Sequence, residues 1–125
     1  MTRLTLRVDF GERGAVGPGK VRLLELVDEH GSIAAAGRAM GMSYRRAWLL
    51  IDSLNQSFRK PLVTTQLGGS GGGGAVLTVF GRQIVKHYRA MEAEATAATA
   101  RHLRALQKAL SDRPVAIAGS ETDEA

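Results

Sequence analysis

The sequence contains no cysteine, which excludes disulfide bridges, thiolate zinc sites and thiol catalysis. It is also poor in aromatic residues, at 5%, with one tryptophan, Trp48. Its apolar runs are far shorter than the roughly 20 residues of a membrane-spanning helix. Its first residues alternate in polarity instead of forming a charged and apolar leader. For a chain of 125 residues, these absences predict one cytoplasmic domain with no membrane partner.

Catalytic motifs and metal-binding clusters are missing too. The three histidines, His30, His87 and His102, are scattered, and none is paired in sequence with a nucleophile or a second ligand. A nucleotide-binding P-loop needs Gly-Lys-Ser or Gly-Lys-Thr directly before a helix, and no lysine follows the glycine-rich residues 68–74. We therefore expect no enzyme activity, no cofactor and no metal.

Acidic residues are scarce in the middle of the chain, where basic residues are common. Between residues 38 and 89 the one acid is Asp52, against eight basic residues: Arg38, Arg45, Arg46, Arg59, Lys60, Arg82, Lys86 and Arg89. The formal net charge of the whole chain is +5. Such a one-sided segment favours a polyanionic partner, although a solvated basic surface would have the same composition.

The first half of the chain is predicted to form a strand and three helices. Residues 4–10 alternate in polarity with period two, which predicts a half-buried strand, and the glycines of residues 11–19 predict a loop. Apolar residues then recur at helical spacing. They predict a helix that starts near Pro18 and ends at Gly31, a second over residues 33–40 after the N-cap Ser32, and a third over residues 44–58 after the N-cap Ser43.

The second half is predicted to form a hairpin, one long helix and a tail. Residues 62–67 and 75–77 have the composition of strands, and six of the seven residues between 68 and 74 are glycine. Thr78 is expected to cap a helix that continues to about residue 110. Residues 111–125 contain a proline and four acids, which predicts a disordered tail.

The spacing of residues 32–54 is typical of a helix-turn-helix. Gly37 is the small residue where two helices would approach, Gly41 lies in the turn, and Ala47 and Leu50 follow on the inner face of the second helix. A hairpin follows this motif. The pattern predicts a mainly α fold with a small β wing, that is, a winged helix-turn-helix.

The second helix of this motif is predicted to have one face for the core and one for DNA. Trp48 lies beside the apolar stripe and is expected in the core rather than stacked on a base. The N-terminal half of such a helix enters the major groove, where arginine can bridge two acceptors of guanine. Ordinary exposed helix residues are the alternative interpretation of Arg45 and Arg46. The predicted core stripe is Ala47, Leu50 or Ile51, Leu54 and Phe58.

The glycine-rich loop is predicted to be the tip of the wing. Glycine has no side chain and adopts positive φ freely, so its N–H groups can approach DNA phosphates closely. An inert flexible loop is the alternative. The residues predicted to contact DNA are Ser32, Ser43, Tyr44, Arg45, Arg46, Leu49, Arg59, Lys60, Gly69, Ser70 and Gly71.

Four segments carry a family resemblance: Gly31-Ser32-Ile33, the heptapeptide from Met42 to Trp48, Gly68-Gly69-Ser70-Gly71-Gly72-Gly73, and the heptapeptide from Ala75 to Gly81. Together they resemble the N-terminal DNA-binding domain of the ModE family of molybdate-responsive regulators, close kin of the LysR-type winged helix. The pairing of Ser-Tyr-x-x-Ala-Trp with the glycine wing is its most specific part. The resemblance implies that residues 43–46 open the recognition helix and that residues 68–74 form the wing.

Two departures from that family matter. Ser70 stands where the family usually has lysine, which leaves that wing position without a cationic phosphate contact. Full-length members continue into a molybdate-binding domain, and this sequence ends at Ala125, so molybdate binding is not expected of it. Two functions stay open: a homodimeric DNA-binding regulator without its own sensor, or an interaction module that dimerises with or modulates a longer regulator and hardly binds DNA.

The final helix is predicted to form a homodimer, because about 30 residues at roughly 1.5 Å per residue project beyond a small domain. Apolar residues recur along it at heptad-like spacing, with a second stripe of leucines beside them. A monomer with this helix folded back is the alternative. The expected organisation is a DNA-binding domain at 1–77, a dimerisation helix at 78–110 and a tail at 111–125. The predicted dimer contacts are Ile84, Tyr88, Met91, Ala95, Leu103 and Leu106.

Overall fold

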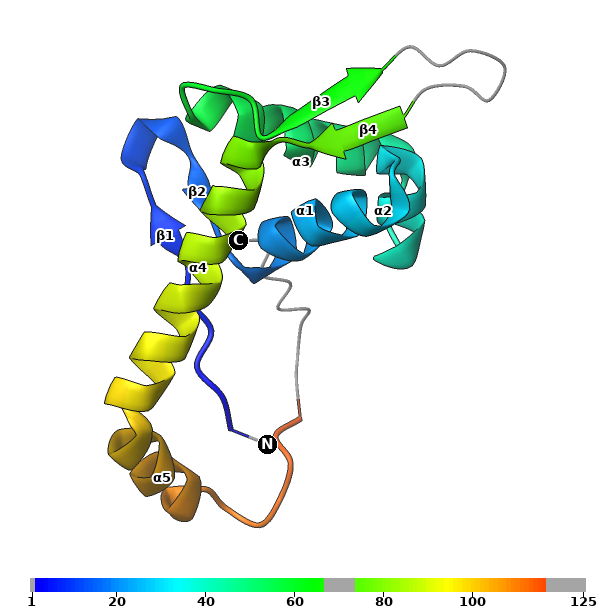
Figure 1. The fold of residues 1–125 in the computed structure, drawn as a ribbon. Coiled ribbons are helices and arrows are strands. Elements are labelled where there is room, and N and C mark those ends of the chain that lie inside the picture. Colours follow the sequence, from blue (N-terminus) through cyan, green and yellow to red (C-terminus); the bar gives the residue numbers. More distant parts are fainter. Residues whose placement is uncertain (1, 67–73, 117–125) are drawn as a thin grey trace.

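The computed structural model describes residues 2–66 and 74–116. The elements are β1 (Val8–Asp9), the 3-10 turn η1 (Gly11–Arg13), β2 (Ala15–Val16), α1 (Pro18–His30), α2 (Ile33–Ala39), α3 (Tyr44–Ser57), β3 (Val63–Gln66), β4 (Gly74–Leu77), α4 (Val79–Ala98) and α5 (Ala100–Ala109). This is a winged helix-turn-helix, mainly α with a small β wing, as predicted. Figure 1 shows the β3–β4 hairpin, here called the wing, and α5 at opposite ends of the molecule.

Helix α1 forms the centre of the core. Its side chains Val21, Leu23, Leu24 and Val27 are fully buried, because α2, α3, α4 and β4 all pack against it. Each such burial stabilises the fold by about 1.5–3 kcal/mol. Pro18 occupies the first turn, and Gly31 ends the helix in the left-handed conformation with φ 74°. Both ends of α1 therefore lie where the sequence predicted them.

The helix-turn-helix consists of α2 and α3. Gly37 is buried where the two helices meet, and a Cβ there would lie 3.0 Å from the Cβ of Ala47, so a larger residue would push the helices apart. Gly41 makes the turn with φ 72°. The N-cap hydroxyls of Ser32 and Ser43 accept hydrogen bonds from the amides of residues 35 and 46, at 2.9 and 3.1 Å. The sequence prediction for this motif is confirmed.

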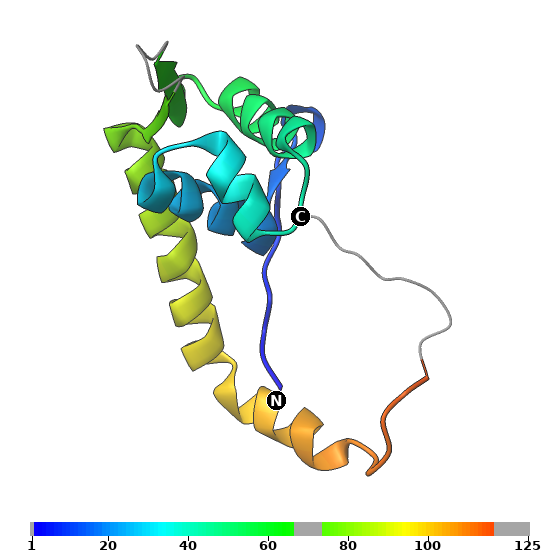
Figure 2. The ribbon, with the colours of Figure 1, turned by 90° about the vertical axis from the view of Figure 1, so that its right-hand side faces the viewer.

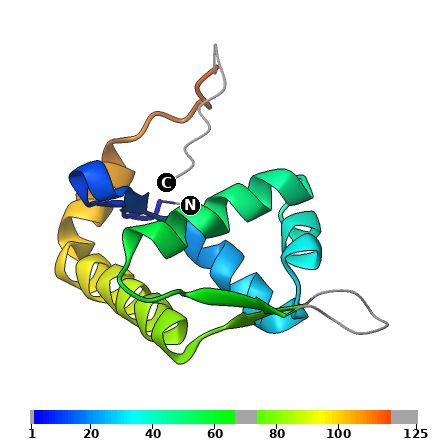
Figure 3. The same ribbon diagram turned by 90° about the horizontal axis from the view of Figure 1, so that it is seen from above.

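The two strands of the wing are antiparallel, and Val63 pairs with Leu77 at its base. Leu62, Val63, Ala75 and Leu77 turn their side chains into the core, which anchors the hairpin. The amide of Ala75 also donates to the carbonyl of Gly31 at the end of α1, over 2.9 Å. Seen from above, the strands of the wing extend from the start of α4 to the end of α1 (Figure 3). Residues 67–73, the predicted wing tip, lie outside the described residues.

The N-terminal segment differs from the predicted single strand and loop. Residues 2–10 alternate between half-buried and exposed side chains as expected, but only Val8–Asp9 form a strand, paired with β2 inside the predicted loop. The turn between them is closed by Asp9 Oδ1, which accepts from the amide of Gly11 at 2.8 Å. A two-residue partner strand leaves almost no periodicity in the sequence, so only the alternation was predictable.

The predicted single helix over residues 79–110 is wrong, because the chain bends at Thr99. Helix α4 ends at Ala98 and α5 begins at Ala100. The Thr99 hydroxyl donates to the carbonyl of Ala95 at 2.7 Å, and such back-bonding favours a bend. Figure 2 shows α5 turned away from the axis of α4, with the extended N-terminal segment beside them. The Thr2 hydroxyl donates to the side chain of Gln107 on α5.

Candidate nucleic-acid interface

The N-terminal half of α3 presents a polar and basic face to solvent. Ser43, Tyr44, Arg45, Arg46 and Leu49 are all exposed, as the sequence predicted for the contact face. On the opposite side of the helix, the side chains in contact with the core are Ala47, Ile51 and Leu54. The predicted choice between Leu50 and Ile51 is thereby decided: Ile51 is buried and Leu50 is half-buried, as is Phe58.

A shallow hollow of about 240 Å³ lies on this exposed face of α3. It is lined by Ser43, Arg45, Arg46, Leu49 and Leu50. Four residues that were predicted to contact DNA, together with Leu50, therefore share one surface. Arginine on such a surface has the reach and the donor geometry to bridge the acceptors of a guanine edge.

Trp48 is not in the core, which corrects the sequence prediction. Its side chain is 42% exposed, whereas Ala47 beside it is fully buried. The reason is the close approach of α2 and α3 at Gly37, where the packing holds a methyl group and has no room for an indole. One residue further along the helix means about 100° of rotation. Trp48 therefore points to the side of α3 that faces the wing.

Ser32 belongs to this same side of the molecule. It lines a hollow of about 390 Å³ together with Tyr44 and Trp48 of α3 and residues of β3 and β4. Its hydroxyl oxygen is already the cap of α2, so its first role is structural. Beside it, Thr65 and Gln66 are exposed and line the hollow, although sequence analysis did not select them. The only signal was their position in a strand that leads to the glycine-rich loop.

Arg59 and Lys60 are exposed but lie beyond the other end of α3. The 14 residues of the helix separate them from Arg45 by about 20 Å. The Lys60 ammonium lies 5.7 Å from the centroid of the Phe80 ring, next to the start of α4. The structure therefore does not bring these two residues together with the basic face of α3. The predicted wing contacts Gly69, Ser70 and Gly71 lie outside the described residues.

Two of the eight central basic residues are held in ion pairs that tie α4 to α1. Arg82 contacts Asp28 at 3.0 Å, and Arg89 contacts Glu25 at 2.9 Å and Glu92 at 2.7 Å. The hydrogen bonds from Arg89 lower the pKa of the Glu25 carboxyl below its ordinary value. Because these two arginines stabilise the fold, fewer than eight of the central basic residues contribute to a basic surface for a partner.

Asn55 joins the end of α3 to the start of the wing. Its Oδ1 accepts from the amides of Leu62 and Val63 at 2.8 and 3.2 Å, and its Nδ2 donates to the carbonyl of Val63 at 3.0 Å. One amide side chain thus fixes the wing relative to α3. This residue was not predicted from the sequence, because an asparagine near the end of a helix has no distinguishing pattern.

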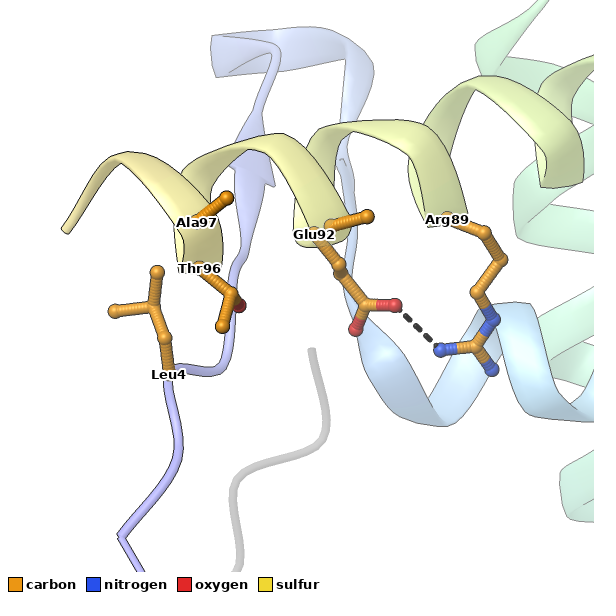
Figure 4. A pocket seen from close by; sticks show the side chains of 6 residues that line it. Leu4, Arg89, Glu92, Thr96 and Ala97 are labelled. Carbon is orange, nitrogen blue, oxygen red and sulfur yellow. Dashed lines mark hydrogen bonds and ion pairs between the residues drawn. The ribbon is translucent and has the colours of Figure 1, made fainter. Parts of the chain in front are cut away.

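A further open hollow of about 500 Å³ lies between the N-terminal segment and α4. Figure 4 shows Leu4 facing Thr96 and Ala97, with Arg89 directed to Glu92. Its charged groups are thus already occupied by each other and by Glu25. Within residues 2–66 and 74–116, no group of three side chains is placed to hold a metal ion. No helix in that part of the chain is long and apolar enough to cross a membrane.

The predicted dimer residues on α4 and α5 have different environments. Met91 is 41% exposed and Leu106 62% exposed, whereas Ile84, Ala95 and Leu103 are half-buried. Tyr88 is 1% exposed, because its ring packs in the core and its hydroxyl donates to the carbonyl of Leu6 at 2.6 Å. Burial raises the pKa of this hydroxyl. Tyr88 therefore stabilises its own chain and is not available on the surface.

Comparison with known proteins agrees with this geometry. Residues 19–82 match the model of the family described as bacterial regulatory helix-turn-helix protein, lysR family. The chain is 42% identical over 94 residues to the molybdenum transport protein ModE of Azotobacter vinelandii, covering 75% of this chain and 34% of that protein. It is 37% identical over 102 residues to the molybdenum-pterin-binding protein MopB of Rhodobacter capsulatus, covering 82% and 36%.

A third relative is the DNA-binding transcriptional dual regulator ModE of Escherichia coli (strain K12), 39% identical over 71 residues, which are 57% of this chain and 27% of that protein. The chain spans about a third of the length of the relatives it matches, 34% and 36% for the first two. The resemblance found in the sequence motifs is confirmed. The chain belongs to the lysR family of bacterial regulatory helix-turn-helix proteins, and its helix-turn-helix domain is ModE-like.

Proposed function

We propose that this protein is a transcription regulator that binds double-stranded DNA sequence-specifically as a homodimer. The observation that carries the proposal is the exposed, basic N-terminal half of α3 in a helix-turn-helix of a regulator family. In such folds this part of the second helix enters the major groove. The protein then works in the cytoplasm by occupying DNA, without an enzymatic step.

The contacts divide into those that specify a sequence and those that position the protein. Arg45 and Arg46 are the residues we assign to base edges, because guanidinium groups bond guanine bidentately. Ser43 and Tyr44 have hydroxyl groups suited to phosphate or base. The wing tip, at Gly69, Ser70 and Gly71, is assigned to the DNA backbone, and Arg59 and Lys60 to phosphates further along the duplex.

The homodimer rests on large apolar side chains that are exposed on α4, on α5 and at the residue directly after α5. Met91, Leu106 and Leu110 are exposed at 41%, 62% and 61%. A second copy would cover them, and Ile84, Ala95 and Leu103 would complete the contact. Tyr88 is left out of this interface because it is buried. A two-fold dimer suits two half-sites about 34–36 Å apart, or a multiple of that spacing.

The test is binding to DNA from upstream of the protein's own operon, measured by fluorescence anisotropy at several salt concentrations. We expect an affinity that falls steeply with salt, because each neutralised phosphate releases counterions. We also expect weaker binding to a scrambled sequence of the same length. A dimer that binds neither the upstream DNA nor the scrambled sequence would overturn the proposal. It would favour the interaction module that modulates a longer regulator.

A further inference from the structure

The exposed indole of Trp48 is a candidate contact residue, because tryptophan and tyrosine are enriched at interfaces. Trp48 is 42% exposed and Tyr44, one helical turn before it, is 57% exposed. Residues four apart on a helix lie on the same face. The two rings therefore form one aromatic surface on the side of α3 that faces the wing.

This aromatic surface is one wall of the hollow of about 390 Å³ between α3 and the wing. Thr65 and Gln66 of β3 and Ser32 also line this hollow. A separate, smaller hollow of about 150 Å³ is also lined by Trp48, together with Asn55 and Val63. Trp48 thus lines both hollows, and the larger one also has hydroxyl and amide side chains in its lining.

The hollow has no charged side chain in its lining, and the two arginines of α3 line a separate hollow. Arg45 and Arg46 follow Tyr44 on α3 and are exposed beside it. The one acid between residues 31 and 79 is Asp52, which lines the smaller hollow and accepts a hydrogen bond from Gln56 at 2.6 Å. A phosphate in the larger hollow would therefore meet hydroxyl and amide side chains and no carboxylate in the lining.

We propose that this hollow receives one sugar-phosphate strand of the DNA duplex, with Trp48 packed against a deoxyribose. The inference rests on the proposed function. If α3 lies in the major groove and the wing contacts the neighbouring backbone, the strand between them passes through the space between α3 and β3. The apolar face of the sugar suits the indole ring, and Thr65, Gln66 and the indole N–H suit phosphate oxygens. Trp48 is then a positioning contact that fixes the register of α3.

The test uses the intrinsic fluorescence of Trp48, which is the only tryptophan in the chain. Binding is followed separately, by the anisotropy of labelled duplex DNA. We expect bound DNA to protect the wild-type indole from acrylamide quenching and to shift its emission, because the strand covers the ring. This measurement needs no variant, so it does not depend on whether a substitution at Trp48 folds.

Variants give the second readout. We expect Trp48→Ala to weaken DNA binding about tenfold. Trp48→Phe should weaken it by less because phenylalanine retains a ring, although some loss remains because it has no N–H donor. Val115→Ala, at an exposed apolar residue beyond α5, is the matched control and should bind as wild type. DNA binding without protection of the indole, or Trp48→Ala with wild-type affinity, would overturn this inference alone. No DNA binding by the wild type would overturn the proposed function and this inference with it.

Discussion

Single side chains determine which parts of this protein are buried and which are exposed to a partner. Ser32, Ser43 and Thr78 act as helix caps, and all three were predictable because a cap needs a short polar side chain at one position before an apolar period. The environments of Trp48 and Tyr88 were not predictable. Trp48 was expected in the core and is exposed, whereas Tyr88 was expected at the dimer contact and is buried. The helical period fixes a face only to within about one residue, and the close contact at Gly37 and the N-terminal segment over Tyr88 decide the rest.

Arg45 and Arg46 are the residues on which sequence preference should depend. We expect Arg45→Ala or Arg46→Ala to weaken binding by about 1–3 kcal/mol and to reduce the preference for the operator over a scrambled duplex. A residue that only neutralises a phosphate would weaken both duplexes equally. Competition binding at one salt concentration separates these cases, with Arg113→Ala, an exposed residue beyond α5, as a control of equal charge. Unchanged affinity and preference in both variants would show that the recognition surface lies elsewhere.

Gly81 should not tolerate a methyl group, although it lies in a helix where alanine normally adds stability. A Cβ at this position would lie 2.3 Å from the carbonyl oxygen of Leu62 and 2.7 Å from Leu77 Cδ1. We expect Gly81→Ala to lower the free energy of unfolding by more than about 2 kcal/mol, against a gain of about 1 kcal/mol from helix propensity. Thermal unfolding with Gln83→Ala, exposed two residues further along α4, as control would show this. A stabilised Gly81→Ala protein would contradict the close approach of α4 to the wing.

At the level of whole elements, patterns with many repeats were predictable and short or bent ones were not. The three core helices and the wing follow from helical and alternating periods that extend over several residues. The strand β2 is two residues long, and the bend at Thr99 depends on one hydroxyl, so neither leaves a pattern. The candidate site was predicted for α3 but not for β3, because a polar strand beside a hollow is recognisable only after folding.

The hydrogen bonds of Asn55 should be needed for the wing to keep its position beside α3. Asn55→Ala would leave the amides of Leu62 and Val63 without this acceptor. We expect a loss of about 1–3 kcal/mol in unfolding free energy, and weaker DNA binding even where the protein is fully folded. Chemical unfolding and anisotropy at low temperature measure the two effects. Gln56→Ala, exposed on the next position of α3, is the control. If Asn55→Ala were as stable as the wild type, Asn55 would not be needed to hold the wing beside α3.

The ion pair between α1 and α4 should make stability depend on pH in the acid range. Arg89 lowers the pKa of Glu25 from its ordinary value of 4.5, so the folded state favours the charged carboxylate. The resulting stability is present above that ordinary value and is lost as the pH falls through the lowered one. We expect Glu25→Gln to reduce the loss of unfolding free energy at acid pH by less than about 1 kcal/mol, because the pair is partly solvated.

Urea unfolding at pH 6, 4 and 3 would measure the effect, with Glu94→Gln, at an exposed carboxylate on α4, the helix of Arg89, as a control. The difference between wild type and Glu25→Gln should be largest at the highest of these pH values. A difference that grows toward acid would mean that the pair does not stabilise α4 against α1.

The whole molecule is asymmetric, with the wing at one end and α5 at the other (Figure 1). We expect it to sediment at equilibrium as a dimer at micromolar concentration, with twice the 13.3 kDa of one chain. Burying Met91 and Leu106 against a second copy gives the driving force, so Met91→Glu and Leu106→Glu should shift the protein toward monomer. A wild-type mass of one chain would exclude the dimer, and a dimer unaffected by both changes would place the interface elsewhere.

The direct passage from β4 through Thr78 into α4 has a mechanical consequence. Thr78 bonds both to the carbonyls before the wing, at Pro61 and Leu62, and to the first turn of α4. The hairpin and the helix therefore turn as one body. Helix α4 has 20 residues and measures about 30 Å, so a tilt of about 10° at its base moves its far end by about 5 Å. In the proposed homodimer, small rotations of one helix-turn-helix domain would thus be magnified into changes in the spacing between the two domains.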